Sequence, residues 1–121
     1  MNYTRIFSLC LLICICLSVS AQKKVLLFTK TTGFRHKSIP KGVTTVTKLL
    51  EEEGIRTVHS EDVSYFCADS LSQFDALLFL STTGDLFNAQ QKEAFQTFIR
   101  SGKGFMGIHA ATDTEFNWPW Y

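Results

Sequence analysis

Cysteine is scarce in this sequence once its first segment is set aside. Three of the 4 cysteines, Cys10, Cys14 and Cys16, lie within the first 21 residues, which leaves Cys67 alone in the remainder. A single thiol can form neither a disulfide framework nor a thiolate metal cluster, so small domains stapled in either way are excluded.

The sequence also lacks a charge excess and a long apolar run. Its formal net charge is +1 and no basic run is longer than Lys23 and Lys24, so nothing indicates nucleic acid as a partner. No apolar stretch has the roughly 20 residues that a membrane-spanning helix needs. Apolar side chains are abundant, however: 45% of the residues are hydrophobic and 11 are phenylalanine, which predicts one packed globular core.

Residues 1–21 have the layout of a secretory signal peptide. Arg5 supplies the positive start, residues 6–17 form a short apolar core, and Val19, Ser20 and Ala21 precede the expected cleavage site after Ala21. We therefore expect a secreted or periplasmic protein with no stable membrane anchor after cleavage. The alternative is an uncleaved anchor, which the shortness of the apolar run disfavours.

Apolar runs alternate with amphipathic segments along the rest of the chain. Continuous apolar runs predict strands buried on both faces, and apolar residues spaced by 3 or 4 predict helices. Ser38 and Asn88 are expected to cap two helices, and Gly54 and Gly102 to end them. The alternation is typical of an α/β fold, a parallel sheet with helices on both faces. The expected strands cover residues 24–29, 55–60, 75–81 and 104–109, and the expected helical segments cover 38–54, 69–74 and 88–102.

The sequence stops before the helix expected after its fourth strand. A doubly wound sheet generally has five or more strands with a helix after each. We therefore expect residues 22–121 to be the N-terminal part of one domain, truncated after the fourth strand.

Polar side chains follow three of the predicted strands. In an open parallel sheet, ligands bind in the crevice beyond the carboxyl ends of the strands, where these loops converge. The side chains able to hold a polar ligand there are Thr31, Thr32, Arg35, His36 and Ser38 after the first strand, Thr82, Thr83 and Asp85 after the third, and His109, Thr112, Asp113 and Glu115 after the fourth.

His109 is the candidate for acid/base chemistry. It follows the apolar run "GFMGI", and Asp113, four positions on, is able to orient the imidazole and stabilise its charge. The alternative is a core histidine that donates to a backbone carbonyl, and the residues alone leave both interpretations open. His36 lies in an exposed loop before a helix, whereas His59 ends a strand without comparable neighbours and is expected to be structural.

Two other chemistries are disfavoured. The "TTG" of residues 31–33 suggests a phosphate cradle, but neither a Walker lysine pattern nor G-x-G-x-x-G accompanies it. A nucleophile elbow needs Ser or Cys between glycines, where this sequence has "GIHAA", and Cys67 lies on another loop without an evident base. Histidine acid/base or metal-assisted chemistry remains. A divalent metal is possible, although no metal-spacing motif such as H-E-x-x-H is present.

Three aromatic residues, Trp118, Trp120 and Tyr121, follow the acid. Aromatic rings near polar groups are the usual platform for the apolar faces of sugars. A W-P-W segment can equally be a core plug that covers the end of a sheet, and the sequence leaves the two alternatives open.

Three motifs, "GFRHKSIP", "STTGDLFNAQQ" and "GFMGIHAATDTEFNWPWY", resemble the ThuA-like, or trehalose utilisation, family over residues 24–121. The resemblance implies a flavodoxin-like three-layer α/β/α fold related to class I glutamine amidotransferases, and a further His-containing motif beyond Tyr121. This sequence has Ser81 where the family commonly has Asn. Carried over by position, the site residues are His36, Thr83, Gly84, Asp85, His109, Asp113, Trp118 and Tyr121.

The expected function is that of an exported hydrolase or lyase acting on trehalose-like disaccharides or keto-glycosides. His109 would be the general acid/base oriented by Asp113, and His36 would assist or ligate a metal. Thr83, Gly84, Asp85, Trp118 and Tyr121 would contact a small-molecule or oligosaccharide substrate. The alternatives are a non-catalytic carbohydrate-binding or accessory module and, third, a cysteine-type amidotransferase relative that uses Cys67.

Overall fold

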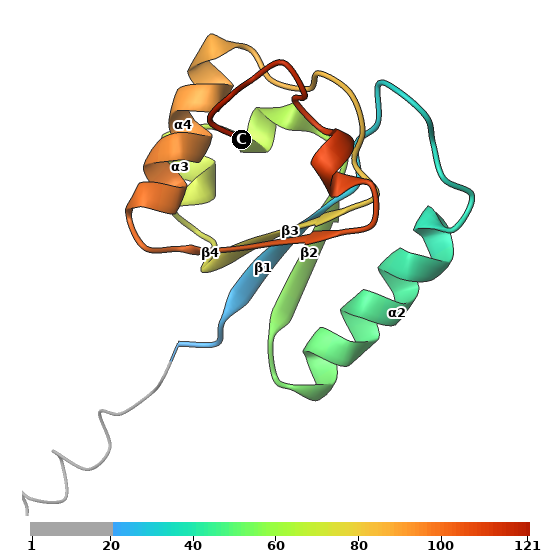
Figure 1. The fold of residues 1–121 in the computed structure, drawn as a ribbon. Helices are drawn as coiled ribbons and strands as arrows, with labels where there is room; N and C mark the ends of the chain where they lie inside the picture. The colour runs from blue at the N-terminus through green and yellow to red at the C-terminus, as the bar shows by residue number, and fades with distance from the viewer. Residues whose placement is uncertain (1–20) are drawn as a thin grey trace, which may run out of the picture.

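The computed structural model of the chain describes residues 21–121 (Figure 1). The predicted alternation of strands and helices is confirmed in this part of the chain, whereas the predicted signal peptide lies outside it apart from Ala21. The elements are β1 Lys24–Phe28, α2 Ile39–Glu52, β2 Arg56–Ser60, the 3-10 turn η1 Val63–Tyr65, α3 Ala68–Leu71, β3 Ala76–Leu80, α4 Ala89–Arg100, β4 Gly104–Ile108 and the 3-10 turn η2 Ala111–Asp113.

The four strands form one parallel sheet in the order β2-β1-β3-β4. The chain moves from β1 outward to β2, then crosses back to β3 on the other side of β1. This reversal between β1 and β3 is the topological switch point of a flavodoxin-like sheet, the place where ligands bind in such folds. The predicted fold class is therefore confirmed.

Alternate residues of the central strands pack on opposite faces of the sheet, which gives two core clusters. Leu26, Phe28, Leu77 and Phe79 lie in the cluster under α3 and α4, together with Phe95. The intervening residues Val25, Leu27, Leu78 and Leu80 lie in the cluster under α2. Figure 1 shows α2 on one side of the sheet and both α3 and α4 on the other. Period-two burial on both faces explains why β1 and β3 are continuously apolar.

The helix ends test the predicted caps. Asn88 caps α4 as predicted, because its side chain accepts from the Gln91 N–H while the Gln91 side chain accepts from the Asn88 N–H. Ser38 is at the N-cap position of α2, as predicted, and its carbonyl accepts from the Gly42 N–H. Its side chain makes no capping hydrogen bond, and its backbone angles are helical rather than extended.

The fourth strand is less buried than its apolar sequence predicts. Among the described residues β4 pairs only with β3, so it lies at an edge of the sheet. Phe105 is 44% exposed although its ring contacts those of Phe79 and Phe95, and Met106 is 59% exposed. The expectation that this strand is buried on both faces is therefore wrong for residues 21–121, because no helix of this part covers Met106.

Candidate functional site

The structure brings His36 and His109 together at the carboxyl edge of the sheet. His36 lies in the loop before α2 and His109 directly follows β4. Their imidazole centroids are 4.6 Å apart with an angle of 74° between the ring planes. Phe34 extends this row, since its ring lies 4.8 Å from that of His36 and is 70% exposed. Two predicted catalytic residues thus share one surface with an exposed aromatic ring.

A strained turn follows His109. Ala110 has φ of 60°, a left-handed conformation that residues other than glycine rarely adopt, and the chain turns there from β4 into η2. A nucleophile elbow has the same strand, strained residue and helix order, but here its apex carries only a methyl group. The structure thus shows an elbow-like turn whose apex has no nucleophile.

Ser81 supplies a second strained position, at the end of β3 and therefore at the switch point. It is buried and has φ of 54°. Asn tolerates this conformation better than Ser because its short amide can hydrogen-bond locally. The backbone angle gives a physical reason why a family would favour Asn at this position.

Asp113 lies in the same loop as His109. The Asp113 side chain is exposed, and no hydrogen bond or ion pair joins it to His109 anywhere in residues 21–121. The backbone groups of Asp113 are hydrogen-bonded: its N–H donates to Ala110 O, and its carbonyl accepts from the Gly84 N–H. The role of Asp113 in orienting the imidazole stays a prediction.

Thr83 and Gly84 join the loops on either side of the switch point. The buried Thr83 hydroxyl donates to Phe34 O at 2.9 Å, and the Thr83 carbonyl accepts from the Thr32 N–H at 2.9 Å. Gly84 has φ of 81°, and a Cβ there would clash with the Thr32 hydroxyl and lie 2.9 Å from the Gly33 nitrogen. Both residues thus hold the loop that carries Phe34 and His36.

The phosphate-cradle interpretation of residues 31–33 is disfavoured by the same contacts. A phosphate would need the backbone N–H groups of this loop. The N–H groups of Thr32 and Gly33 both point to the Thr83 carbonyl, at 2.9 and 3.5 Å.

Asp85 differs from Thr83, since its side chain is exposed while its carbonyl accepts from the Thr32 hydroxyl.

Glu115 is the buried acid of the region, and from the residues alone it was expected only to be one of several polar side chains of the loop after β4. Only 1% of its surface is exposed, and its φ is 52°. Its Oε1 accepts from the Leu86 and Phe87 N–H groups at 2.6 and 2.7 Å, and its Oε2 lies 2.6 Å from Lys92 Nζ. Glu115 therefore fastens the loop after β4 to the loop before α4.

The aromatic residues at positions 118, 120 and 121 pack against the core cluster under α4. All three rings lie about 6 Å from that of Phe95, with centroid distances of 6.3, 5.8 and 6.2 Å. The Tyr121 hydroxyl donates to Ala111 O at 2.8 Å, and burial raises the pKa of Tyr121 to about 12. Their packing is that of the core plug, so substrate contacts by Trp118 and Tyr121 stay a prediction.

A polar cluster that was not predicted from the sequence joins the ends of β1 and β2. The buried Thr29 hydroxyl lies 2.8 Å from His59 Nε2 and 3.2 Å from Glu61 Oε1, and Arg35 Nη2 donates to the same Glu61 oxygen at 2.7 Å. The hydrogen bond from Arg35 holds the pKa of the Glu61 carboxyl below its usual value. Since Glu61 then only accepts, Thr29 donates to it and receives a hydrogen bond from His59 Nε2.

This cluster corrects the expectation that His59 lacks comparable neighbours. Its neighbours come from another strand, which the sequence does not place beside it. The signal that could have found them is the parallel pairing of β1 with β2, where Phe28 is opposite Ser60.

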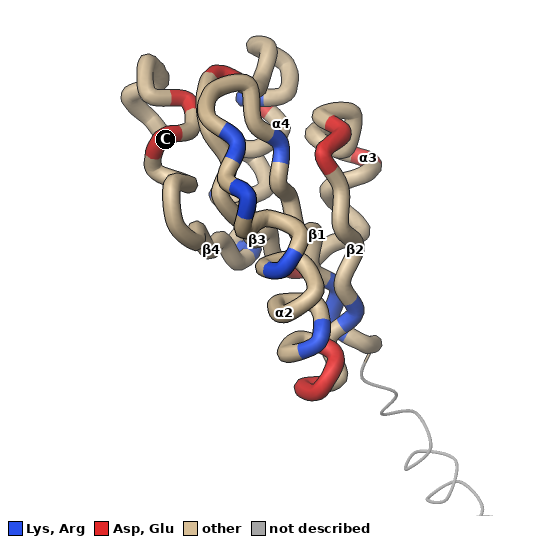
Figure 2. The backbone as a smooth tube through the Cα atoms, turned by 90° about the vertical axis from the view of Figure 1, so that its right-hand side faces the viewer, with Lys and Arg blue, Asp and Glu red and all other residues tan. Residues whose placement is uncertain are grey.

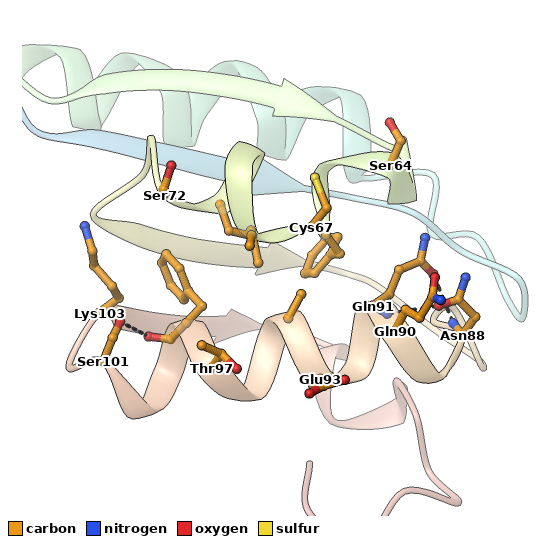
Figure 3. A pocket seen from close by; sticks show the side chains of 15 residues that line it. Ser64, Cys67, Ser72, Asn88, Gln90, Gln91, Glu93, Thr97, Ser101 and Lys103 are labelled. Carbon is orange, nitrogen blue, oxygen red and sulfur yellow. Dashed lines mark hydrogen bonds between the residues drawn. The ribbon is translucent and has the colours of Figure 1, made fainter.

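A groove of about 720 Å³ lies between α3 and α4, and its lining includes neither His36 nor His109 (Figure 3). Cys67 lies in it, with its Sγ 3.3 Å from Ser70 Oγ, and the hydrogen bonds from Ser70 lower the pKa of the thiol. Among the residues that line the groove, no base contacts Cys67. The residues that line the groove are Ser64, Phe66, Cys67, Ala68, Leu71, Ser72, Asn88, Gln90, Gln91, Glu93, Ala94, Thr97, Phe98, Ser101 and Lys103.

Along the backbone of residues 21–121, Lys and Arg residues and Asp and Glu residues both occur in several separate segments (Figure 2). In this range no helix is long and apolar enough to cross a bilayer. Nor does this range contain three or more His, Cys, Asp or Glu side chains arranged to hold a metal ion. The His36 and His109 pair would need ligands from elsewhere to complete a metal site.

The parallel sheet, its switch point and the elbow-like turn without a nucleophile define a flavodoxin-like α/β protein with a histidine pair at the carboxyl edge of its sheet. The chain belongs to the ThuA family, described as trehalose utilisation, because the family model matches residues 24–121. A crystal structure described as a ThuA-like protein from Bacteroides uniformis has the same fold, with a TM-score of 0.65 and 22% identity. The match covers 81% of this chain and 41% of that one, so this chain spans less than half of that protein. A comparison with curated proteins finds no match.

Proposed function

We propose that this protein is an exported carbohydrate-metabolism enzyme, a hydrolase or lyase that acts on trehalose-like disaccharides or keto-glycosides. The observation that carries the proposal is the contact between His36 and His109 at the carboxyl edge of a ThuA-family sheet. Imidazole changes its protonation near neutral pH, so a facing pair can supply both an acid and a base to one substrate.

Each residue of the site has a proposed role. The exposed His109 is the general acid/base, and the half-buried His36 assists it across the crevice. Asp113, exposed in the same loop, stabilises the imidazolium once a substrate draws the loop together. Asp85, the other exposed acid of the converging loops, offers a hydrogen-bond acceptor to sugar hydroxyl groups.

Phe34 adds an aromatic surface to the proposed sugar site. Its ring is 70% exposed and lies against His36, so the apolar face of a pyranose ring can stack on it beside the imidazole pair. Trp118 and Tyr121 support the same site from within the core, where they pack against Phe95. A divalent metal held by His36 and His109 would instead polarise a substrate oxygen, provided that further ligands complete its coordination.

Export is the second part of the proposal. It rests on the signal-peptide layout of residues 1–21, with cleavage after Ala21 and no stable membrane anchor afterwards. The expected substrates are then small or oligomeric sugars outside the cytoplasm. Mass spectrometry of the exported protein tests this, since a mature N-terminus at Gln22 is the predicted result.

The test of the activity is product formation by the purified full-length protein from trehalose-type disaccharides and 3-keto-glycosides. His109→Ala is expected to lower turnover by roughly 100-fold or more, as loss of a general acid/base does. Cys67→Ser is the matched control and is expected to leave turnover unchanged. Unchanged turnover after His109→Ala would overturn the assignment.

The second candidate is a non-catalytic carbohydrate-binding or accessory module. The observation that favours it is the absence, within residues 21–121, of a hydrogen bond between His109 and Asp113. Titration calorimetry with the same sugars separates the two functions, because binding without product formation identifies the module.

A further inference from the structure

The loop between β1 and α2 is attached to the carboxyl edge of the sheet in two opposite directions. Arg35 reaches toward the end of β2, where its Nη2 donates to Glu61 Oε1 at 2.7 Å. The next residue, His36, reaches toward the end of β4, where its ring meets that of His109 at 4.6 Å. Arg35 and His36, which are consecutive in the loop, thus contact residues on opposite sides of the switch point between β1 and β3.

The Arg35 side chain is itself held at both of its terminal nitrogens. While Nη2 bonds to Glu61, Nη1 donates to the Thr31 hydroxyl at 3.5 Å. The planar guanidinium group therefore has a fixed orientation, which a lysine ammonium group would not provide.

Glu61 is also fixed, although 40% of its side chain is exposed. Its Oε1 accepts from the buried Thr29 hydroxyl at the end of β1, and that hydroxyl is in turn bonded to His59. The carboxylate is thus tied to two strands of the sheet, and Arg35 transfers this attachment to the loop.

We propose that Glu61 and Arg35 form an anchor that positions His36 against His109. The anchor residues touch no substrate in this account, so they are positioning residues rather than catalytic ones. The inference rests on the proposed function only for the importance of His36, since the contact between the two rings can be measured without any substrate.

An ion pair at the surface suits such a role. Exposed pairs contribute little to global stability, so removal of this one is expected to change the loop and not the fold. One residue before Arg35, the loop is also held by Thr83, whose hydroxyl donates to Phe34 O. Without the anchor, the segment between Thr31 and α2 keeps the hydrogen bonds of Thr32, Gly33 and Phe34 to the loop after β3. Its tie to the end of β2 is lost, so the His36 ring can rotate away from His109.

The test is the nuclear Overhauser effect between the imidazole C–H protons of His36 and His109 in the purified full-length protein. Glu61→Gln and Arg35→Gln are each expected to abolish this signal or reduce it several-fold. Glu52→Gln is the matched control, because it removes the exposed Lys48–Glu52 pair of α2 by the same change. The control is expected to keep the signal, and all variants are expected to unfold at nearly the same temperature.

Two results would overturn the anchor. One is a wild-type signal in Arg35→Gln, a change in an exposed loop that leaves the core intact even if Glu61→Gln fails to fold. The other is an equal loss in Glu52→Gln, which would show a general effect of surface charge. If turnover of a sugar is established, Glu61→Gln should lower kcat with little change in KM. If the protein has no activity on sugars, the measured contact between the two rings still tests the anchor. The proposed function and the anchor can therefore be contradicted independently.

Discussion

Single residues at the carboxyl edge fall into two groups. His36, His109, Asp85 and Asp113 have half-buried or exposed side chains that a ligand can reach. Buried polar side chains such as Glu115 instead bind the backbone of neighbouring loops. The first group can carry chemistry, while the second keeps the loops in the geometry that the first requires.

Tyr121 belongs to the second group and makes stability depend on alkaline pH. Its neutral hydroxyl donates to Ala111 O, and burial raises its pKa to about 12 from about 10. The folded protein therefore keeps a proton that the unfolded chain releases above pH 10. The resulting stabilisation is complete below about pH 10 and is lost as the pH rises toward about 12.

Tyr121→Phe is accordingly expected to lower the free energy of unfolding by about 1 kcal/mol at neutral pH, the net value of one hydrogen bond. It should also remove most of the decline between about pH 10 and 12. Urea unfolding at a series of pH values measures both effects. Tyr65→Phe, in the same core cluster, is the control and should keep the decline. An identical alkaline decline in Tyr121→Phe would contradict the account.

At the scale of elements, loops rather than helices determine the shape of the site. The loop after β1 is tied to the loop after β3 by Thr83, and the loop after β3 is tied to the loop after β4 by Gly84 and Glu115. Three segments far apart in the sequence thus form one connected rim around the switch point.

Glu115 is the strongest single tie of this rim. Glu115→Ala would leave the Leu86 and Phe87 N–H groups and the Lys92 ammonium group without their carboxylate. Unpaired buried polar groups are costly, so the free energy of unfolding should fall by about 3 kcal/mol or more. Glu115→Gln should lose less, because its amide oxygen still accepts. Chemical denaturation measures the change, and Glu93→Ala on the exposed side of α4 should stay within about 0.5 kcal/mol of wild type. Equal stabilities for all three variants would contradict the tie.

The strands and helices could be predicted from the sequence because each rests on local patterns. The apolar run of β1, the Asn88 cap and the Gly102 end of α4 need only neighbouring residues. The pairing of His36 with His109 followed from one topological rule, that the ends of parallel strands converge.

The remaining contacts depend on which strands are neighbours, and the sequence does not show this. Thr29, which is hydrogen-bonded to His59, lies at the end of β1. Leu86, whose N–H donates to Glu115, lies in the loop before α4. The missing side-chain cap at Ser38 has a local reason, since the backbone of Ser38 has helical rather than extended angles. The apolar run of β4 does not by itself show that this strand lies at an edge, because such a run looks the same at an edge as in the centre of a sheet.

In residues 21–121 taken together, the β4 edge is an exposed apolar surface of the sheet. Phe105 and Met106 point to opposite faces of β4, and both are exposed. An apolar edge strand offers both backbone pairing and apolar contact to another chain.

Residues 22–121 expressed alone are therefore expected to self-associate through β4. Met106→Lys should shift the distribution toward monomer, since a charge on an edge strand opposes strand pairing. Light scattering after size-exclusion chromatography at several concentrations measures the shift, with Met106→Leu as the control that keeps the association. A monomeric wild-type chain that melts cooperatively at every concentration would contradict this prediction.

If His36 and His109 form one catalytic site, a double-mutant cycle on the full-length protein will show it. Steady-state kinetics on a disaccharide or keto-glycoside would compare His36→Ala, His109→Ala and the double variant. We predict that the His109 change lowers kcat/KM by roughly 100-fold or more, and that the double variant is little worse than the worse single one, because residues that act as a unit are non-additive. Losses that multiply in the double variant, or a His109→Ala enzyme as active as wild type, would contradict the claim.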